Sequence, residues 1–246
     1  MIEFGGIIEC RMGSSRLPGK SLRDLCGKPM LERLLIRLEF SELLEKIVVA
    51  TTNKSKDDAI QEICLKKGVT CFRGSEQNVL ERVLRAAEGS SIQNIVELHG
   101  DNPFLDPQLI DESIKIFMKG HYDYLTNTLK KTFPQGTRIQ IFPTKKLKEV
   151  SEITSDPSVQ EHVTLYFYEN PSKYKIFNLE ANRDMRRPEL RFTVDTIEDF
   201  NFIESIYKRI EDKKLKPNFS IKEVIKIIDD NNLKILNRDI SSKPVR

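Results

Sequence analysis

The sequence predicts an α/β protein with a mostly parallel β-sheet between two layers of helices. Two observations predict this fold class. Short β-rich apolar runs alternate with helical patterns through the first hundred residues, and alternation of this kind is typical of right-handed strand–helix–strand units that cover both faces of a parallel sheet. After Asp101 the alternation breaks, which indicates a smaller inserted α+β subdomain beside the parallel half.

The first half alternates regularly between predicted strands and predicted helices. The strand candidates are short runs rich in Ile, Val, Thr and Phe, and the helix candidates carry apolar residues on one face, such as Leu31, Leu34 and Leu38. In chain order the predicted strands span 4–9, 46–51, 69–72 and 94–100, and the predicted helices span 29–40, 56–67 and 78–88. Because ligands bind beyond the carboxyl ends of such strands, we expect the functional loops to follow IIEC, VVAT, TCF and VELH.

The second half departs from this alternation. The segment TFPQGTRIQIF predicts a turn followed by a strand whose Arg138 and Gln140 face outward. We expect one domain over 1–236, with 120–190 as its inserted subdomain, and a polar tail over 237–246. The other predicted helices span 107–118, 145–150, 158–168, 197–210 and 221–230, and the other predicted strands span 122–126, 175–179 and 190–194.

The composition excludes several classes of function. The 246 residues carry a net charge of +3, with 39% hydrophobic and 31% charged residues. Basic residues are interleaved with acidic ones and form no aromatic-rich basic face, so no nucleic-acid partner is predicted. Without an apolar run of 18 residues or a leader-like start, we expect no membrane partner and a cytoplasmic location. The four cysteines match no zinc or redox spacing and are expected to be reduced thiols.

The segment RMGSSRLPGKS, residues 11–21, directly follows the first predicted strand and predicts a phosphate-binding loop. Its glycines allow close backbone approach, and its N–H groups would point at an anion. Arg11, Arg16 and Lys20 add three positive charges, which suits a triphosphate. The loop is not a P-loop, because five residues separate Gly13 from Gly19 and Pro18 removes an N–H donor.

The string IIECRMGSSRLPGKSL resembles the nucleotide-binding signature of the sugar cytidylyltransferases, and more narrowly that of the spore coat polysaccharide biosynthesis protein F family. Further segments match that family in order over roughly residues 4–204: RGSEQNVLERVLRAA, LHGDNPFLDPQLID, TNTLKKTFPQG, EHVTLYFYENP and LRFTVDTIEDF. The resemblance implies a three-layer, Rossmann-like sheet of the nucleotide-diphospho-sugar transferase type. It also implies Mg²⁺-dependent transfer of CMP from CTP to a small acidic sugar, with release of pyrophosphate, for cell-surface polysaccharide biosynthesis.

Two aspartates are the predicted metal ligands. Asp101 ends one predicted strand and Asp195 ends another, and Mg²⁺ prefers carboxylate oxygens together with substrate phosphates. From the residues alone, Asp101 could simply open a turn and Asp195 could cap the helix that begins near Thr196. The spacing alone favours the capping interpretation for Asp195, whereas the resemblance implies that both aspartates hold Mg²⁺.

The resemblance also implies roles for other residues. Arg16, Lys20 and Asp101 would be catalytic, and Arg73, Ser75 and Arg82 would lie near the base or ribose. From the residues alone, Arg82 is better explained as a helix-surface arginine paired with Glu81 or Glu88. His99 is given no functional role. The implied nucleotide-binding set is Arg11, Met12, Gly13, Ser14, Ser15, Arg16, Lys20, Arg73, Gly74, Ser75, Arg82 and Gly100.

The acceptor side shows departures from the family pattern. Acidic residues are common in the family where this chain has Arg138 and Gln140, and an Asp is usual where it has Asn78. If Arg138, Gln140 and His162 line an acceptor pocket, the cation favours an anionic acceptor; alternatively, Arg138 and Gln140 face water on an edge strand. The family also implies a homodimer that forms through the inserted subdomain. A metal-dependent glycosyltransferase with a nucleotide-sugar donor and a non-catalytic nucleotide-binding relative remain as alternatives.

Overall fold

The computed structural model describes residues 1–233 and 237 of the chain. In this part of the chain, seven strands form one sheet in the order β3-β2-β1-β4-β6-β5-β7. The strands are β1 (Ile2–Glu9), β2 (Lys46–Thr52), β3 (Thr70–Gly74), β4 (Ile92–His99), β5 (Tyr124–Thr126), β6 (Gln140–Pro143) and β7 (Ile176–Asn178). Strands β1 to β4 are parallel, and β6 pairs antiparallel with both β4 and β5.

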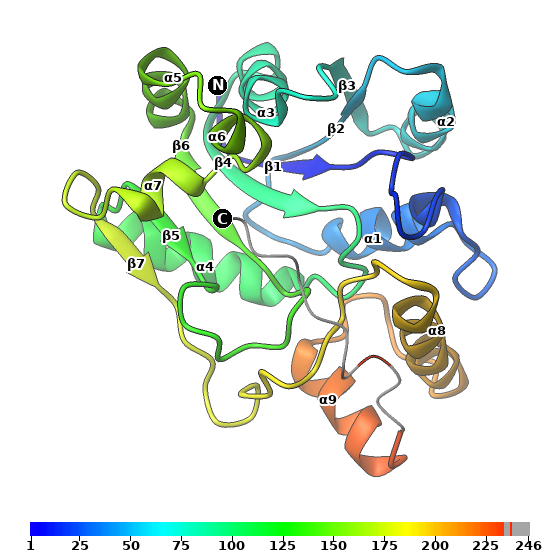
Figure 1. Ribbon diagram of the computed structural model, residues 1–246. Helices are drawn as coiled ribbons and strands as arrows, with labels where there is room; N and C mark the ends of the chain where they lie inside the picture. The colour runs from blue at the N-terminus through cyan, green and yellow to red at the C-terminus, as the bar shows by residue number, and fades with distance from the viewer. Residues whose placement is uncertain (234–236, 238–246) are drawn as a thin grey trace.

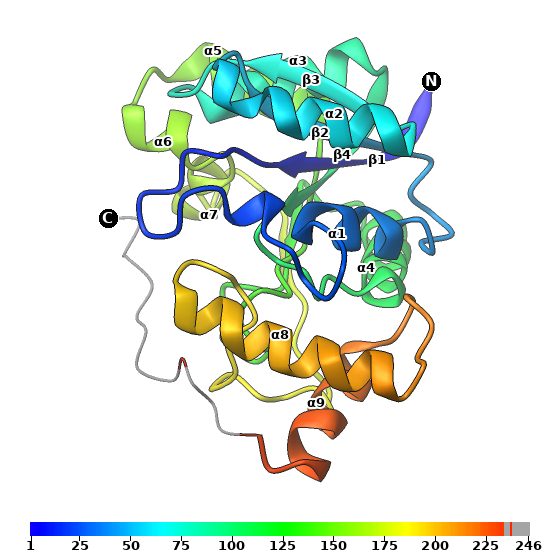
Figure 2. The same cartoon turned by 90° about the vertical axis from the view of Figure 1, so that its right-hand side faces the viewer.

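Helices cover both faces of this sheet, as the alternation predicts (Figures 1 and 2). Helices α1, α2 and α4 pack on one face, and α3, α5, α6 and α7 pack on the other. Helices α8 and α9 form a third core with the segment around Phe192. The helices are α1 (Met30–Leu38), α2 (Asp58–Lys67), α3 (Val79–Gly89), α4 (Pro107–Gly120), α5 (Thr144–Ile153), α6 (Pro157–Glu161), α7 (Leu165–Glu169), α8 (Ile197–Asp212) and α9 (Ile221–Asp230).

The two faces of β1 and β4 follow the two-residue period of a strand. On β1, Ile8 belongs to the core under α1 and α4, whereas Ile7 belongs to the core under α3 and α5. On β4, Val96 and Ile95 divide between the two cores in the same way. This alternation decides which side of the sheet each polar residue at the carboxyl ends of these strands faces.

Three predictions for the second half are wrong. The predicted strand over 190–194 is an irregular segment with one described bridge, between Gln135 and Arg191. The chain at Gly136 packs closely against this segment. A Cβ at position 136 would lie 2.4 Å from the backbone nitrogen of Thr193, so only glycine lets the two backbones come so close. The predicted helix over 158–168 is split into α6 and α7, and His162 ends the first of them.

The third wrong prediction is the outward orientation of Gln140. The residue is only 3% exposed, because β6 lies between β4 and β5 rather than at an edge of the sheet. The alternative that both residues face water on an edge strand is therefore wrong for Gln140, whereas Arg138 lies before β6 and is exposed. The predicted tail over 237–246 lies outside the described residues except for Asn237.

Candidate active site

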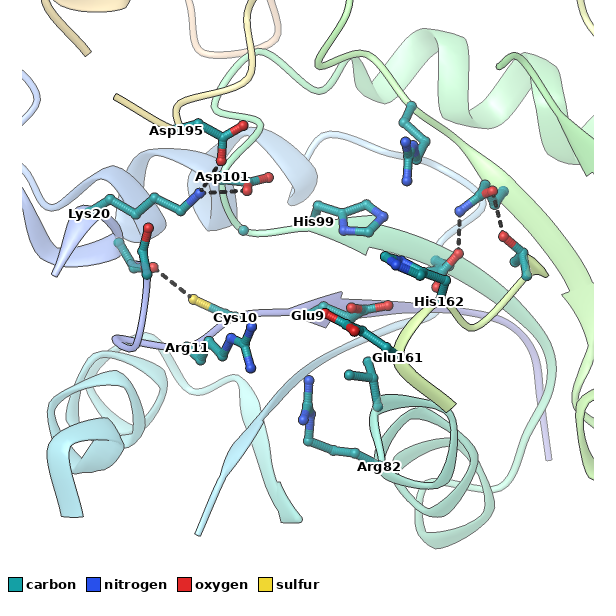
Figure 3. Close-up of a pocket in the computed structure, with 18 of the residues that line it drawn as sticks. Glu9, Cys10, Arg11, Lys20, Arg82, His99, Asp101, Glu161, His162 and Asp195 are labelled. Carbon is teal, nitrogen blue, oxygen red and sulfur yellow. Dashed lines mark hydrogen bonds and ion pairs between the residues drawn. The ribbon is translucent and has the colours of Figure 1, made fainter. Parts of the chain in front are cut away.

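A cavity of about 770 Å³ opens at the carboxyl ends of β1 and β4 (Figure 3). Both halves of the chain line it. The first half contributes the loop after β1, part of α3 and the end of β4, and the second half contributes β6, the α6–α7 turn and the segment before α8. The predicted site residues that line the cavity are Arg11, Gly13, Ser14, Ser15, Arg16, Lys20, Arg82, Gly100, Asp101, Arg138, Gln140, His162 and Asp195.

The loop after β1 is held in shape by its own backbone and by a buried carboxylate. Gly19 has a φ of +71°, a left-handed conformation that glycine adopts without steric cost, and its N–H donates to the Met12 carbonyl at 3.2 Å. The Met12 N–H in turn donates to Asp57 at 2.7 Å, and Asp57 is fully buried. The loop therefore folds back on itself, and Lys20 follows it directly.

Lys20 joins the two predicted metal ligands. Its ammonium lies 2.7 Å from Asp101 Oδ2 and 3.0 Å from Asp195 Oδ1, and it donates to the Val194 carbonyl at 2.7 Å (Figure 3). Burial by itself lowers the pKa of Lys20, but the two carboxylates outweigh it and raise that pKa above its ordinary value. Residues from the start, middle and end of the chain therefore meet at one buried cation.

Asp195 is held by two arginines in addition to Lys20. Its Oδ2 lies 2.8 Å from Arg16 and 2.6 Å from Arg191. Burial tends to raise the pKa of Asp195, but the charges of Lys20, Arg16 and Arg191 lower it below its ordinary value. The carboxylate is therefore ionised, and the geometry keeps it directed at Lys20.

Arg191 and Asp199 were not among the predicted site residues. Arg191 also pairs with Asp199 at 2.9 Å, and both side chains are buried. Asp199 forms a capping box with Thr196 at the start of α8, so Thr196 rather than Asp195 caps this helix. The spacing Thr-x-x-Asp is a capping signal that the sequence does contain, but the ion pair behind Asp195 depends on the tertiary fold.

Four predicted residues do not line the cavity within the described chain: Met12, Arg73, Gly74 and Ser75. Arg73 holds the turn after β2, because its guanidinium donates to the Thr52 carbonyl at 2.9 Å and pairs with Asp58 at 2.5 Å. A direct contact of these four residues with a nucleotide stays a prediction.

Helix α3 brings Arg82 to the cavity. A Cβ at Gly74 would lie 3.1 Å from Arg82 Cγ, and the Ser75 carbonyl accepts a hydrogen bond from the Arg82 guanidinium, so these neighbours position the arginine. The alternative of a surface arginine is wrong, because Arg82 is only 3% exposed. Asn78 caps α3 by accepting from the Glu81 N–H at 2.9 Å. Asn and Asp cap helices equally well. The presence of Asn78, where the family usually has Asp, therefore leaves the start of α3 unchanged.

The second half of the chain forms the opposite wall. Arg138 is exposed there and His162 is partly exposed, so both side chains are accessible from the cavity. Gln140 is buried and fully engaged. Its Nε2 donates to Glu97, and its Oε1 accepts from Tyr124 at 2.5 Å and from Thr164 at 2.8 Å.

Sequence reasoning missed several polar residues that line the cavity, among them Glu9, Glu97 and His99. Glu97 is 2% exposed, and burial, followed by the charge of Glu9, raises its pKa well above the ordinary value. Burial lowers the pKa of His99. The only indication in the sequence was the two-residue spacing of Glu97 and His99, which places both side chains on one face of β4. Glu9 joins them because it is in register with His99 across β1 and β4.

The comparisons with known proteins decide the family. A family model described as "Cytidylyltransferase" matches residues 6–227. The chain belongs to the cytidylyltransferase family. This cytidylyltransferase is 37% identical over 232 residues to the spore coat polysaccharide biosynthesis protein SpsF of Bacillus subtilis, covering 92% of this chain and 93% of that protein. The resemblance found in the sequence motifs is thereby confirmed.

Solved structures agree with this assignment. A cytidylyltransferase from Leptospira borgpetersenii superposes with a TM-score of 0.90 at 33% identity, covering 99% of this chain and all of that one. A CMP:2-keto-3-deoxy-manno-octonic acid synthetase complexed with CTP superposes with a TM-score of 0.63 at 17% identity, covering 84% of this chain and 99% of that one. The second likeness shows the fold alone and confirms the predicted nucleotidyltransferase type of sheet.

The described residues include no helix that is both long and apolar enough to cross a bilayer.

Proposed function

We propose that this cytidylyltransferase transfers CMP from CTP to a small acidic sugar, with release of pyrophosphate, for the biosynthesis of a cell-surface polysaccharide. Two relatives support the substrates. The name of SpsF refers to spore coat polysaccharide biosynthesis, and the octonic acid synthetase of similar fold was solved with CTP. The acceptor class and the pathway are part of this proposal.

The observation that carries the proposal is the cluster of Arg16, Lys20, Asp101 and Asp195 at one end of the cavity. Arg11, Arg16, Lys20 and the loop N–H groups would bind the triphosphate, which places positive charge where negative charge develops. An acceptor oxygen would attack the α-phosphorus in line, the bond from that phosphorus to the bridging oxygen would break, and pyrophosphate would leave. Positioning and charge stabilisation suffice for such a transfer.

Asp101 and Asp195 are the residues that would hold Mg²⁺. One oxygen of each carboxylate lies within 3.0 Å of the same ammonium group, so the two side chains can converge on a single cation. Both donors are hard oxygens, which is the ligand type that Mg²⁺ prefers. When bound, Mg²⁺ stabilises the negative charge of the phosphates. Lys20, Arg16 and Arg191 meanwhile keep Asp195 ionised and oriented.

The acceptor would bind against the second half of the chain. Arg138 and His162 line the cavity there and could contact an anionic sugar directly, whereas Gln140 would act through the orientation of Glu97. All three residues belong to the predicted subdomain over 120–190, which supports its proposed role on the acceptor side. Dimerisation through the same segment is part of the proposal, and size-exclusion chromatography with light scattering would test it.

A pyrophosphate-release assay tests the proposal. Each of the four ribonucleoside triphosphates is combined with Mg²⁺ and a panel of sugar acids and phosphorylated sugars. We expect turnover with CTP and a sugar acid, and none in the Asp101→Asn variant. Asp230→Asn, at an exposed carboxylate at the end of α9, is the matched control. Failure of CTP both to turn over and to raise the melting temperature would refute the nucleotide assignment, and cleavage of a nucleotide-sugar instead would favour the glycosyltransferase alternative.

A further inference from the structure

We propose that Glu9, Glu97 and His99 form a second cation site in the cavity, separate from Asp101 and Asp195, that binds a divalent transition-metal ion such as Zn²⁺, Mn²⁺ or Co²⁺. Figure 3 shows His99 between Asp101 and His162, and Glu9 beside Glu161. The binding of the ion follows from these three side chains alone. A role for the ion toward the acceptor rests on the proposed function.

The sheet brings the three side chains together. Strands β1 and β4 are parallel neighbours, and Glu9 is in register with His99. Glu97 lies two residues before His99, so both side chains leave β4 on the same face. Deeper in the sheet, Ile7 and Ile95 occupy this face and pack under α3 and α5. The apolar layer therefore ends in a polar cluster at the carboxyl edge of the sheet, where such folds bind ligands.

The donor atoms of the cluster converge and are incompletely partnered. One oxygen of Glu9, one oxygen of Glu97 and one ring nitrogen of His99 all lie within 4.8 Å of one another. Glu9 Oε1 and His99 Nε2 are buried and have no hydrogen-bond partner among the residues that the structure describes. Buried polar atoms without partners are uncommon in folded proteins. Two such atoms in one cluster of three side chains indicate a ligand that supplies the missing interaction.

The donor set selects the kind of ion. An imidazole nitrogen with two carboxylates suits Zn²⁺ and related first-row metals, whereas Mg²⁺ prefers oxygen ligands only. Metal–ligand bonds of about 2.0–2.2 Å would draw the three donors somewhat closer together. Glu97 is already oriented, because one of its oxygens accepts from Gln140, and Tyr124 and Thr164 fix that amide in turn. Hydrogen bonds of this kind typically orient carboxylate ligands.

Two arginines lie near the cluster and limit its affinity. Arg82 approaches from the α3 side, and Arg138 lines the same cavity. Their charges oppose a bound cation, so we expect weaker binding than at a structural zinc site. The same charges would attract an anionic group of an acceptor, whose oxygen atoms could complete the coordination of the ion. We therefore expect the ion to bind more tightly when an anionic acceptor is bound beside the two arginines.

Co²⁺ titration of the full-length protein tests the proposal, because the visible spectrum of Co²⁺ reports nitrogen and oxygen coordination. The titration is carried out in excess Mg²⁺, which competes for the carboxylates Asp101 and Asp195. We expect one equivalent of Co²⁺ to bind, and the His99→Gln and Glu97→Gln variants to bind it at least about 10-fold more weakly. The matched controls are His121→Gln and Glu112→Gln, which change exposed residues on or next to α4, and they should bind Co²⁺ like the wild type.

Absence of Co²⁺ binding in the wild type, or equal binding in the cluster variants and their controls, would overturn the proposal. Circular dichroism establishes that each variant is folded. Equilibrium dialysis of the Asp101→Asn variant against Zn²⁺ gives a second test, since binding there must persist if the two sites are separate. CTP turnover in Mg²⁺ alone is measured in parallel. A protein that turns over CTP but binds no Co²⁺ refutes only the second site.

Discussion

The buried ion pair behind Asp195 gives the most quantitative prediction, for the substitution Arg191→Met. Arg191 is 4% exposed and pairs with Asp195 at 2.6 Å and with the fully buried Asp199 at 2.9 Å. Removing one partner of a buried pair leaves an uncompensated charge and typically costs about 3–5 kcal/mol. Asp199 keeps hydrogen bonds from the Asp195 and Thr196 N–H groups and from Asn237. We therefore expect a loss near the lower end of that range, about 3 kcal/mol.

Urea unfolding followed by circular dichroism measures this loss, and an unchanged dependence on urea would show that the unfolded state is unaltered. A double-mutant cycle with Asp199→Asn should give a coupling free energy of about 1–3 kcal/mol. Arg186→Met is the control, because Arg186 forms an exposed pair with Glu180 and should change stability by less than about 0.5 kcal/mol. A loss below about 1 kcal/mol for Arg191→Met, well under the usual cost of breaking a buried pair, would refute the stabilising role of this network.

Three further predictions concern other parts of the site. Asp101→Asn should lower CTP turnover at least about 100-fold, because about 2.7 kcal/mol of lost charge stabilisation has that effect, and an unchanged rate would contradict the assignment. Burial and the charge of Glu9 raise the pKa of Glu97 in the folded protein above its ordinary value. The folded state is therefore favoured while Glu97 is protonated, and this contribution to the free energy of unfolding is lost as the pH rises through the folded pKa. Urea unfolding of wild type and Glu97→Gln between pH 4 and 9 should therefore show the variant gaining relative stability as the pH rises, and a constant difference would contradict this. Gly19→Ala should lose about 1–2 kcal/mol in the same assay, because Gly19 has a φ of +71°; the control Gly89→Ala, where a Cβ meets nothing within 4 Å, should lose none.

The sequence predicts the parallel half of the sheet well because local patterns specify it. The apolar runs of β1, β2 and β4 and the leucine face of α1 depend on residues that are near neighbours in the chain. The segment 190–194 shows the limit of this approach. Its β-rich composition predicts a strand. Yet its Phe192 and Val194 N–H groups donate to the carbonyls of Gln135 and Asp101, and these tertiary hydrogen bonds hold it as an irregular connection. Gly136 makes that approach sterically feasible, and no local pattern reveals it.

The candidate site likewise contains residues that the sequence reveals and residues that only the fold brings together. The residues of the loop after β1 are adjacent in the sequence, so their charge and glycine content are visible there. Glu9, Glu97 and His99 become neighbours only through the register of β1 with β4, and each residue taken singly has no distinguishing pattern. Arg191 was missed although Asp195 and Asp199 follow it closely in the sequence, because the pairs form only in the folded segment before α8.

The position of Lys20 has a consequence for the order and strength of binding. The Lys20 ammonium group neutralises the site, since Asp101, Asp195 and the Val194 carbonyl all hold it. A divalent ion arriving alone must displace that group, whereas a triphosphate offers it a new anionic partner. We therefore expect Mg²⁺ and CTP to bind with positive cooperativity. Linkage requires each to raise the affinity of the other by the same factor.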